Sequence, residues 1–182
     1  MAVGLFDIWL LQTVSGSVQT GFYGLAYSIA AVCFVFTGAM TPVITREFSK
    51  YHERKDIEEM RALFRRYVPM LYSVAAYFGV FISFQSDNVL AIFTDEKFAG
   101  AFWVLAVMAL YPIHQTYGQL SGSMFYATEQ TKLYRNIGIV SMGIGVLVTV
   151  LLVYVFNLGA LGLALKMLLS QFIGVTLQHF QS

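Results

Sequence analysis

The feature that most constrains this chain is a run of 38 residues without a charge, from Ile8 to Thr45. A helix that crosses the hydrocarbon core of a bilayer needs about 20 predominantly apolar residues, so the run holds one complete span and part of another. Small polar residues interrupt the run at Ser15-Gly16-Ser17 and again at Thr20-Gly21, where a helix is easily broken. We therefore predict a partial helix at about 4–14 and a complete span at about 22–44.

The composition of the whole chain is that of a membrane protein. Of its 182 residues 58% are hydrophobic and only 12% are charged, against about 25% charged in soluble domains. This number of charges is too small to cover the surface of a soluble domain. Much of the surface must therefore face lipid. The net charge of +1 does not support a nucleic-acid partner. The one cysteine, Cys33, excludes a disulfide framework and offers no metal cluster.

The segment 46–66 differs from the rest of the chain, because it holds seven Lys or Arg and five Asp or Glu in 21 residues. Asp56, with Glu59 three residues later, has the pattern of a capping box that starts a helix. Apolar residues then recur on one helical face: Ile57, Met60, Leu63, Phe64 and Tyr67. We predict that this segment forms an amphipathic helix in a cytoplasmic loop, lying at the membrane surface.

Four further apolar stretches follow, and we expect spans at about 67–86, 99–122, 136–156 and 162–180. The predicted fold is therefore all-α: a single polytopic transmembrane bundle over residues 1–182, with five complete spans and one partial span.

The basic residues indicate how this bundle is oriented. The loops 46–66 and 126–135 hold nine of the eleven Lys and Arg, whereas the opposite side has only Lys97, beside three acidic residues. Because cytoplasmic loops carry an excess of Lys and Arg, we predict that both basic loops and the C-terminus at Ser182 are cytoplasmic. The expected location is the inner (plasma) membrane.

No catalytic signature occurs in the sequence: there is no nucleotide-binding glycine loop, no metal-spaced histidine pair and no nucleophile–base pattern. The acidic group Asp56, Glu58 and Glu59 lies in a solvated charged segment and is interpreted as surface. We therefore expect neither an enzyme, nor a cofactor, nor a metal.

Two charged residues within apolar spans are candidates for function. Asp7 lies about eight residues before the expected end of the first helix near Ser15, a depth of roughly 12 Å at 1.5 Å per residue. A carboxylate at that depth costs a few kcal/mol unless it faces water or a partner. Either the chain start frays toward the interface, or Asp7 lines a hydrophilic cavity. Lys166, near the start of the last span, either faces the same cavity or extends its ammonium to the outer interface.

The span at 99–122 contains Pro112, which cannot donate a hydrogen bond to the carbonyl of Met108. We therefore predict a kink near the middle of this helix. His114 follows two residues later and is a candidate for a proton-coupled group, because its imidazole titrates near neutral pH. The alternative is that His114 simply hydrogen-bonds to a neighbouring helix.

Five short segments, in order over almost the whole chain, carry a family resemblance: Asp7-Ile8-Trp9-Leu10-Leu11-Gln12, Gly21-Phe22-Tyr23-Gly24-Leu25-Ala26-Tyr27, Thr41-Pro42-Val43-Ile44-Thr45-Arg46-Glu47, Tyr126-Ala127-Thr128-Glu129-Gln130-Thr131-Lys132 and Asn157-Leu158-Gly159-Ala160-Leu161-Gly162. They resemble helix ends and turns of the polysaccharide (O-antigen-type, Wzx-like) flippases of the multidrug/oligosaccharidyl-lipid/polysaccharide exporter superfamily. In that resemblance the chain corresponds to the C-terminal half, from the middle of helix seven to helix twelve.

The resemblance implies a MATE-like lobe that moves a lipid-linked oligosaccharide or polysaccharide precursor by alternating access. It also implies a missing N-terminal lobe, encoded upstream in the same gene or supplied by a separate chain, without which this chain is expected to be inactive. Polysaccharide polymerase and glycosyltransferases are further expected partners. The competing hypotheses are a multidrug or other lipid exporter of the same superfamily, and a membrane scaffold subunit that does not transport.

A flippase needs a polar cavity for the sugar headgroup while the lipid tail stays in hydrocarbon. The residues that we expect to line this cavity are Asp7, Tyr23, Tyr27, His114, Gln115 and Lys166. Arg46, at the expected cytoplasmic mouth, could attract the diphosphate of a lipid-linked sugar.

Overall fold

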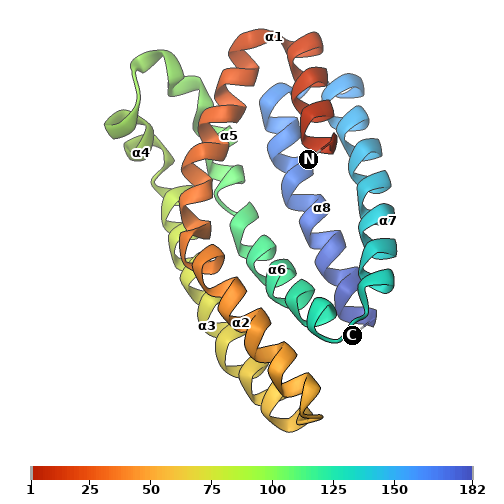
Figure 1. The fold of residues 1–182 in the computed structure, drawn as a ribbon. Helices are drawn as coiled ribbons and strands as arrows, with labels where there is room; N and C mark the ends of the chain where they lie inside the picture. The colour runs from red at the N-terminus through yellow and green to blue at the C-terminus, as the bar shows by residue number, and fades with distance from the viewer. Residues whose placement is uncertain (1, 182) are drawn as a thin grey trace.

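The first helix folds back on itself at a single glycine. The computed structural model describes the backbone of residues 2–181 and the side chains of residues 4–177. In it α1 covers Ala2–Ala31, but Gly16 has φ 83° and ψ 179°, far from helical geometry. Only glycine adopts such a positive φ readily. A short segment of α1 therefore rises to Gly16, and a second segment returns alongside it (Figure 1).

The second segment of α1 continues, through the short turn η1 (Val32–Phe34), into α2 (Val35–Glu53). The span expected at 22–44 thus begins directly after Gly16 and extends nine residues further. The polar residues that suggested a wider break lie within this helix, where the hydroxyl of Thr20 donates to the carbonyl of Gly16 at 3.0 Å.

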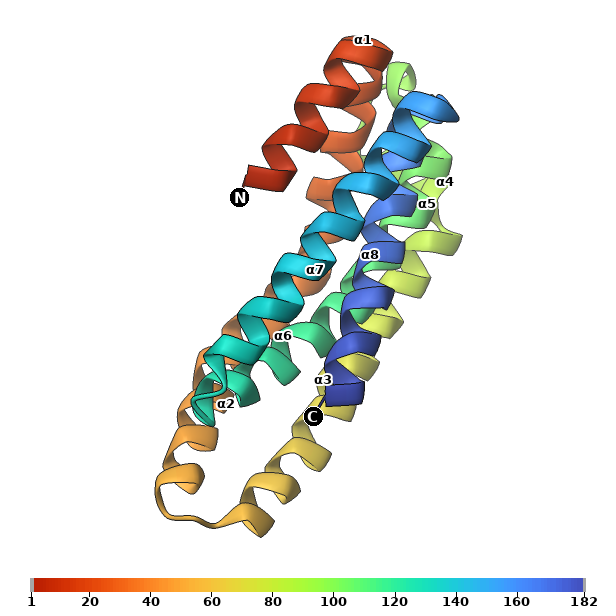
Figure 2. The same cartoon turned by 90° about the vertical axis from the view of Figure 1, so that its right-hand side faces the viewer.

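The charged segment 46–66 does not form a separate helix on the membrane surface, and that prediction is corrected. α2 runs through its first half, and α3 (Ile57–Phe84) begins in its second half and continues into the next span. Asp56 caps α3 as expected, accepting a hydrogen bond from the amide of Glu59 at 3.2 Å. The two helices form a hairpin that projects from one end of the bundle (Figure 2).

The apolar face of this segment explains the correction. Met60 is buried at 3% exposure and packs in one cluster with Ile44 and Phe48 of α2 and with Leu120 of α6. Apart from Ile57, the face that we expected to dip into lipid packs against neighbouring helices, and an amphipathic face needs only such a partner.

At the opposite end lie α4 (Ser86–Phe93) and η2 (Glu96–Ala101), followed by α5 (Phe102–Met108) and α6 (Tyr111–Ala127). Between α5 and α6 the α-helical hydrogen-bond pattern is interrupted, because the amide of Leu110 bonds to the carbonyl of Val107, three residues back, at 3.2 Å. Ser83 of α3 then donates to the carbonyl of Ala106 at 2.8 Å, so a neighbouring helix supplies a hydrogen bond at the break.

The last two spans are α7 (Thr131–Thr149), extended by the π-helical stretch η3 (Val150–Val155), and α8 (Gly159–Gln181). Asn157 and Gly159 both have positive φ, of 50° and 56°, in the tight turn that joins them. This turn lies where the sequence places the last reversal of the chain.

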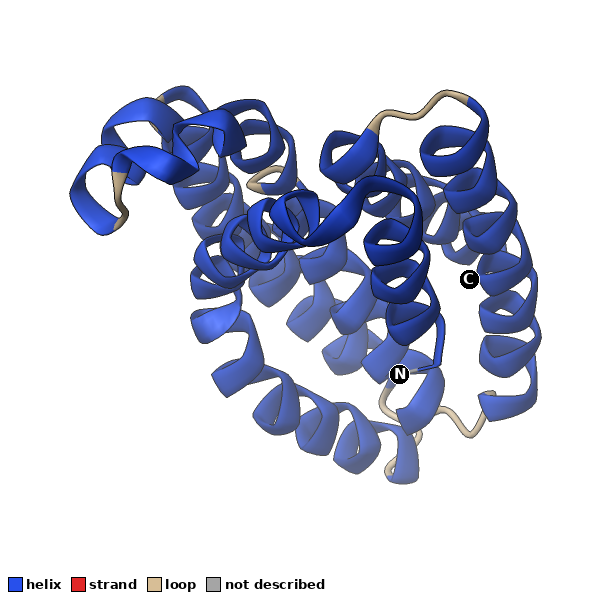
Figure 3. Ribbon diagram, turned by 90° about the horizontal axis from the view of Figure 1, so that it is seen from above, coloured by secondary structure: helices blue, strands red, loops and turns tan. Residues whose placement is uncertain are grey.

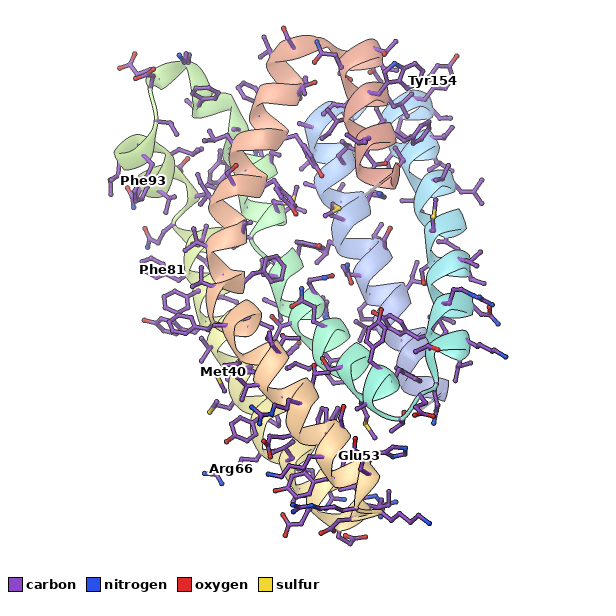
Figure 4. The ribbon with its side chains drawn as sticks, in the orientation of Figure 1. Met40, Glu53, Arg66, Phe81, Phe93 and Tyr154 are labelled. Atoms are coloured by element: carbon purple, nitrogen blue, oxygen red, sulfur yellow. The ribbon has the colours of Figure 1, made fainter. Side chains whose placement is uncertain are left out.

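Five helices are long and apolar enough to cross a membrane, and no strand occurs among the described residues. The expected all-α bundle with five complete spans is confirmed, and the chain is a multi-pass membrane protein. Seen from above, the helices form a bundle and are not arranged in layers (Figure 3). Phe81, Phe93 and Tyr154 point away from the bundle, each at least 53% exposed, as suits lipid-facing side chains (Figure 4).

The connections alternate between the two ends of the bundle. The α2–α3 and α6–α7 connections lie at one end, and the reversal of α1, α4 and the α7–α8 turn lie at the other (Figure 1). The two basic loops therefore share one end of the molecule, as the predicted orientation requires. That this end is cytoplasmic remains a prediction.

Candidate functional site

A buried ion pair joins the first and last helices. Asp7, on the short segment of α1, is 2% exposed, and Lys166, two turns into α8, is 4% exposed. The ammonium of Lys166 contacts Oδ2 of Asp7 at 2.5 Å. The other carboxylate oxygen accepts a hydrogen bond from Thr149 of α7 at 2.8 Å, so three helices meet at this carboxylate.

The pairing answers the energetic problem that each charge poses alone. An isolated charge within a bilayer is costly, and such residues usually face the bundle interior and pair with one another. Asp7 is the one charged residue before Arg46, and Lys166 is the one Lys or Arg after Arg135. Each therefore neutralises the other where no further opposite charge is close in sequence. Both side chains are enclosed by the bundle in this conformation.

Thr149 stands at a special point of α7. Its hydroxyl also contacts the carbonyl of Gly145 at 2.9 Å, and the π-helical stretch begins at the next residue. Short π-helical insertions are rare and often occur at functional sites. The geometry places the change of helical pitch directly beside the ion pair.

A seam of small and hydroxyl residues continues from the ion pair along α7 and α8. A side chain on Gly145 would lie 3.5 Å from Cε of Lys166 and 3.6 Å from Oγ of Ser170, and one on Gly174 would lie 3.6 Å from Oγ of Ser141. The Oγ atoms of Ser141 and Ser170 are buried and have no hydrogen-bond partner. The seam therefore offers donors that the described residues do not use.

The turn at Gly16 is tied to the start of α8. The side chain of Gln19 accepts a hydrogen bond from the amide of Ala160 at 3.0 Å, and so caps one of the free N–H groups of α8. Gly159 takes a positive φ there, and a side chain on it would lie 2.9 Å from Oε1 of Gln19. A polar pocket of 340 Å³ opens beside this contact, lined in part by Ser15, Gln19 and Asn157.

The predicted cavity residues fall into two groups. Asp7 and Lys166 are in direct contact, and Tyr23, 7% exposed, lies near Asp7 and stacks on Tyr27 with ring centroids 6.2 Å apart. Tyr27 itself is 42% exposed. All four lie on α1 and α8.

The remaining predicted residues lie on α6 and α2. His114 is half-buried, with its ring 5.6 Å from that of Phe172 of α8, and Gln115 is half-buried beside it. Pro112 is buried in the first turn of α6, just after the helical break at Ala109–Leu110. Arg46 is exposed. The roles of these residues in a transport path stay predictions.

Sequence reasoning considered Asp7 and Lys166 separately and missed that they pair, and it missed Thr149 altogether. The signal for the pair was present, because two opposite charges isolated in apolar spans are expected to meet. Thr149 gave none, since threonine is common in membrane helices. Among the side chains described, no group of three or more His, Cys, Asp or Glu could hold a metal.

Comparison with known proteins points toward transport. Over 185 aligned positions the chain is 24% identical to the protein named "Probable low-salt glycan biosynthesis flippase Agl15" of Haloferax volcanii. The alignment covers all of this chain and 37% of the relative's length. No family model and no solved structure matches the chain. The likeness is consistent with a flippase-like membrane protein.

Proposed function

We propose that this chain forms part of a flippase that moves a lipid-linked saccharide across the membrane by alternating access. The observation that carries the proposal is the likeness to a protein named a glycan biosynthesis flippase along the entire chain. The sequence resemblance to polysaccharide flippases points the same way.

Features of the fold support a transporter over a scaffold. Transporters concentrate broken helices and intramembrane charges near their binding sites. Here α1 reverses at Gly16, the hydrogen bonding of the helix between Phe102 and Ala127 is interrupted at Ala109–Leu110, and an ion pair lies buried between spans. A scaffold subunit needs none of these features, because apolar helices that pack together suffice to anchor it.

The chain spans 37% of the relative's length, and alternating access requires two bodies that move against each other. We propose that a second lobe, in the same polypeptide or a separate one, completes the transporter. In this proposal the present chain forms one lobe in the plasma membrane, and its α2–α3 connection at Arg54 and its α6–α7 connection at Glu129 lie in the cytoplasm. Asp7, Tyr23, Tyr27, His114, Gln115 and Lys166 would contribute to the polar path between the lobes.

The direct test is a flipping assay in proteoliposomes, with the protein purified from its own membranes together with any subunit that accompanies it. A fluorescent lipid-linked oligosaccharide is incorporated, and a membrane-impermeant reductant bleaches the label in the outer leaflet. We expect bleaching beyond the outer-leaflet fraction, because labels from the inner leaflet reach the reductant. The matched control is a fluorescent phosphatidylcholine, which should stay protected.

Equal protection of both lipids would contradict the proposal and favour a scaffold. Flipping of phosphatidylcholine alone would favour an exporter for other lipids. A topology test accompanies the assay: single cysteines at Ser49 and Asn88, in a Cys33→Ser background, should react with an impermeant reagent from opposite faces.

A further inference from the structure

The short segment of α1 is held to the bundle by one polar residue, in addition to the apolar packing of Leu11 in the core. Among the described side chains of residues 4–15, the polar contacts to other helices are those of Asp7, with Lys166 and Thr149. Thr13 bonds only within its own segment, to the carbonyl of Trp9. Asp7 therefore acts as the polar attachment point for the whole segment.

The segment ends at a residue that can serve as a hinge. Gly16 already has φ 83°, and nothing lies within 4 Å of the position that a side chain would take. The chain beyond Gly16 is held separately, because Gln19 is bonded to Ala160. Hinges are a few element-terminal residues that absorb changes in φ and ψ, so motion at Gly16 would leave the second segment of α1 in place.

Lys166 has the capacity to bind an anion other than Asp7. An ammonium has three donor hydrogens, and among the described residues Lys166 donates to the carboxylate of Asp7. Ser170 lies on the next turn of α8, and its hydroxyl and the Lys166 side chain both border Gly145. The buried hydroxyls of Ser170 and Ser141 are without partners. A tetrahedral anion beside Lys166 would find the hydroxyl of Ser170 as a further donor.

We propose that the anionic phosphate group of the substrate takes the place of Asp7 beside Lys166, and that this exchange frees residues 2–15 to pivot at Gly16. The inference rests on the proposed function, since a lipid-linked saccharide carries such a phosphate at the junction of lipid and sugar. Asp7 is then the resident anion of a latch, and the substrate phosphate is its competitor.

The order of events follows from burial. With the latch closed, Lys166 is 4% exposed, so no phosphate can reach it. The anion binds only after the segment has moved, and it shifts the population toward the open form because it has affinity for that form alone. A ligand with the same lipid but no anion has no such differential affinity, and shifts nothing.

The test measures the position of the segment directly. Spin labels are placed at Leu5 on the segment and Leu147 on α7, which are 70% and 71% exposed, in a Cys33→Ser background. The full chain is held in nanodiscs of zwitterionic lipid. Farnesyl diphosphate should shift the distance distribution away from that of the free protein, and farnesol, which has the same tail without the anion, should leave it unchanged.

Inorganic diphosphate separates the two sources of the anion. A shift with inorganic diphosphate at the same concentration supports exchange by the anion alone, and a shift only with farnesyl diphosphate supports exchange by a lipid-linked phosphate. An equal shift with farnesol, or no shift with either diphosphate, overturns the latch.

Variants locate the effect at Lys166. The Asp7→Asn/Lys166→Met double variant removes both charges without leaving one unpaired, and should no longer respond to farnesyl diphosphate. Lys97→Met, at an exposed lysine paired with Asp95, should respond as the parent does. A response that survives in the double variant contradicts the assignment.

The flipping assay keeps this inference separate from the function. Flipping of the lipid-linked oligosaccharide without any shift on adding farnesyl diphosphate overturns the latch and leaves the function standing. A shift without flipping supports the latch and overturns the proposed function.

Discussion

The α2–α3 hairpin and the junction of α1, α7 and α8 both contain ion pairs, but in opposite surroundings. In the hairpin, Lys50 pairs with Glu47 and Arg61 with Glu58, and all four side chains are at least 32% exposed. At the junction, the side chains of Asp7 and Lys166 are 3% and 5% exposed. Solvent screens the exposed pairs, whereas the junction pair is almost fully buried, so a charge removed there leaves its partner buried and unpaired.

The difference shows where charge carries structural information in this molecule. Twelve charged residues in 46–66 mark one end of the bundle and fix little beyond that. Exposed pairs contribute about 0.2–1 kcal/mol. Two charged residues at the junction favour the contact of α1 with α8, because each would be buried and unpaired without the other.

The largest effect is expected from breaking the buried pair on one side. Lys166→Met leaves the Asp7 carboxylate buried with Thr149 alone, and should lower the free energy of unfolding by about 3–5 kcal/mol. The measurement is an SDS titration of the purified protein in mixed micelles. Lys97→Met is the control and should change little. Equal stability of the two variants would show that the pair is not formed in the membrane.

An intermediate effect is expected at the turn before α8. Gly159→Ala forces a side chain into a positive φ and to within 2.9 Å of Gln19, which should cost about 1–3 kcal/mol. Gly38→Ala is the matched control, since Gly38 is helical with nothing within 4 Å. It should be neutral or slightly stabilising. Loss of stability in both variants to the same degree would contradict the role of the turn.

The smallest effect is expected at the exposed pair. Glu58→Ala removes the partner of Arg61, yet both side chains are at least 60% exposed. The free energy of unfolding should change by no more than about 0.5 kcal/mol. A loss as large as that of Lys166→Met would mean that the hairpin is buried against another body in the working protein, and the contrast between the two regions would fail.

The general fold could be predicted because charge-free runs long enough to cross a bilayer are rare outside membrane proteins. The cap at Asp56 could also be predicted, since it depends on four neighbouring residues. The extent of α2 and α3 could not, because the apolar face around Met60 suits lipid and a neighbouring helix equally well. Only the position of Phe48 and Leu120 decides between them.

For the candidate site, the sequence indicated which charged residues are unusual but not which of them are in contact. Asp7 and Lys166 stand out because each is a lone charge in an apolar span. Their contact joins residues 159 positions apart in the chain, and no local pattern encodes such a separation. Gly16 was recognised as a break, but its role as a reversal depends on a backbone angle that sequence does not fix.

The most direct test of the account is the coupling between Asp7 and Lys166. The free energies of unfolding of Asp7→Leu, Lys166→Met and the double variant form a cycle with the parent protein. If the pair is buried and mutual, each single variant is strongly destabilised, and the double variant regains most of that loss because no unpaired charge remains. Additive losses, with the double variant the least stable of all, would show that the two charges act independently and would contradict the account.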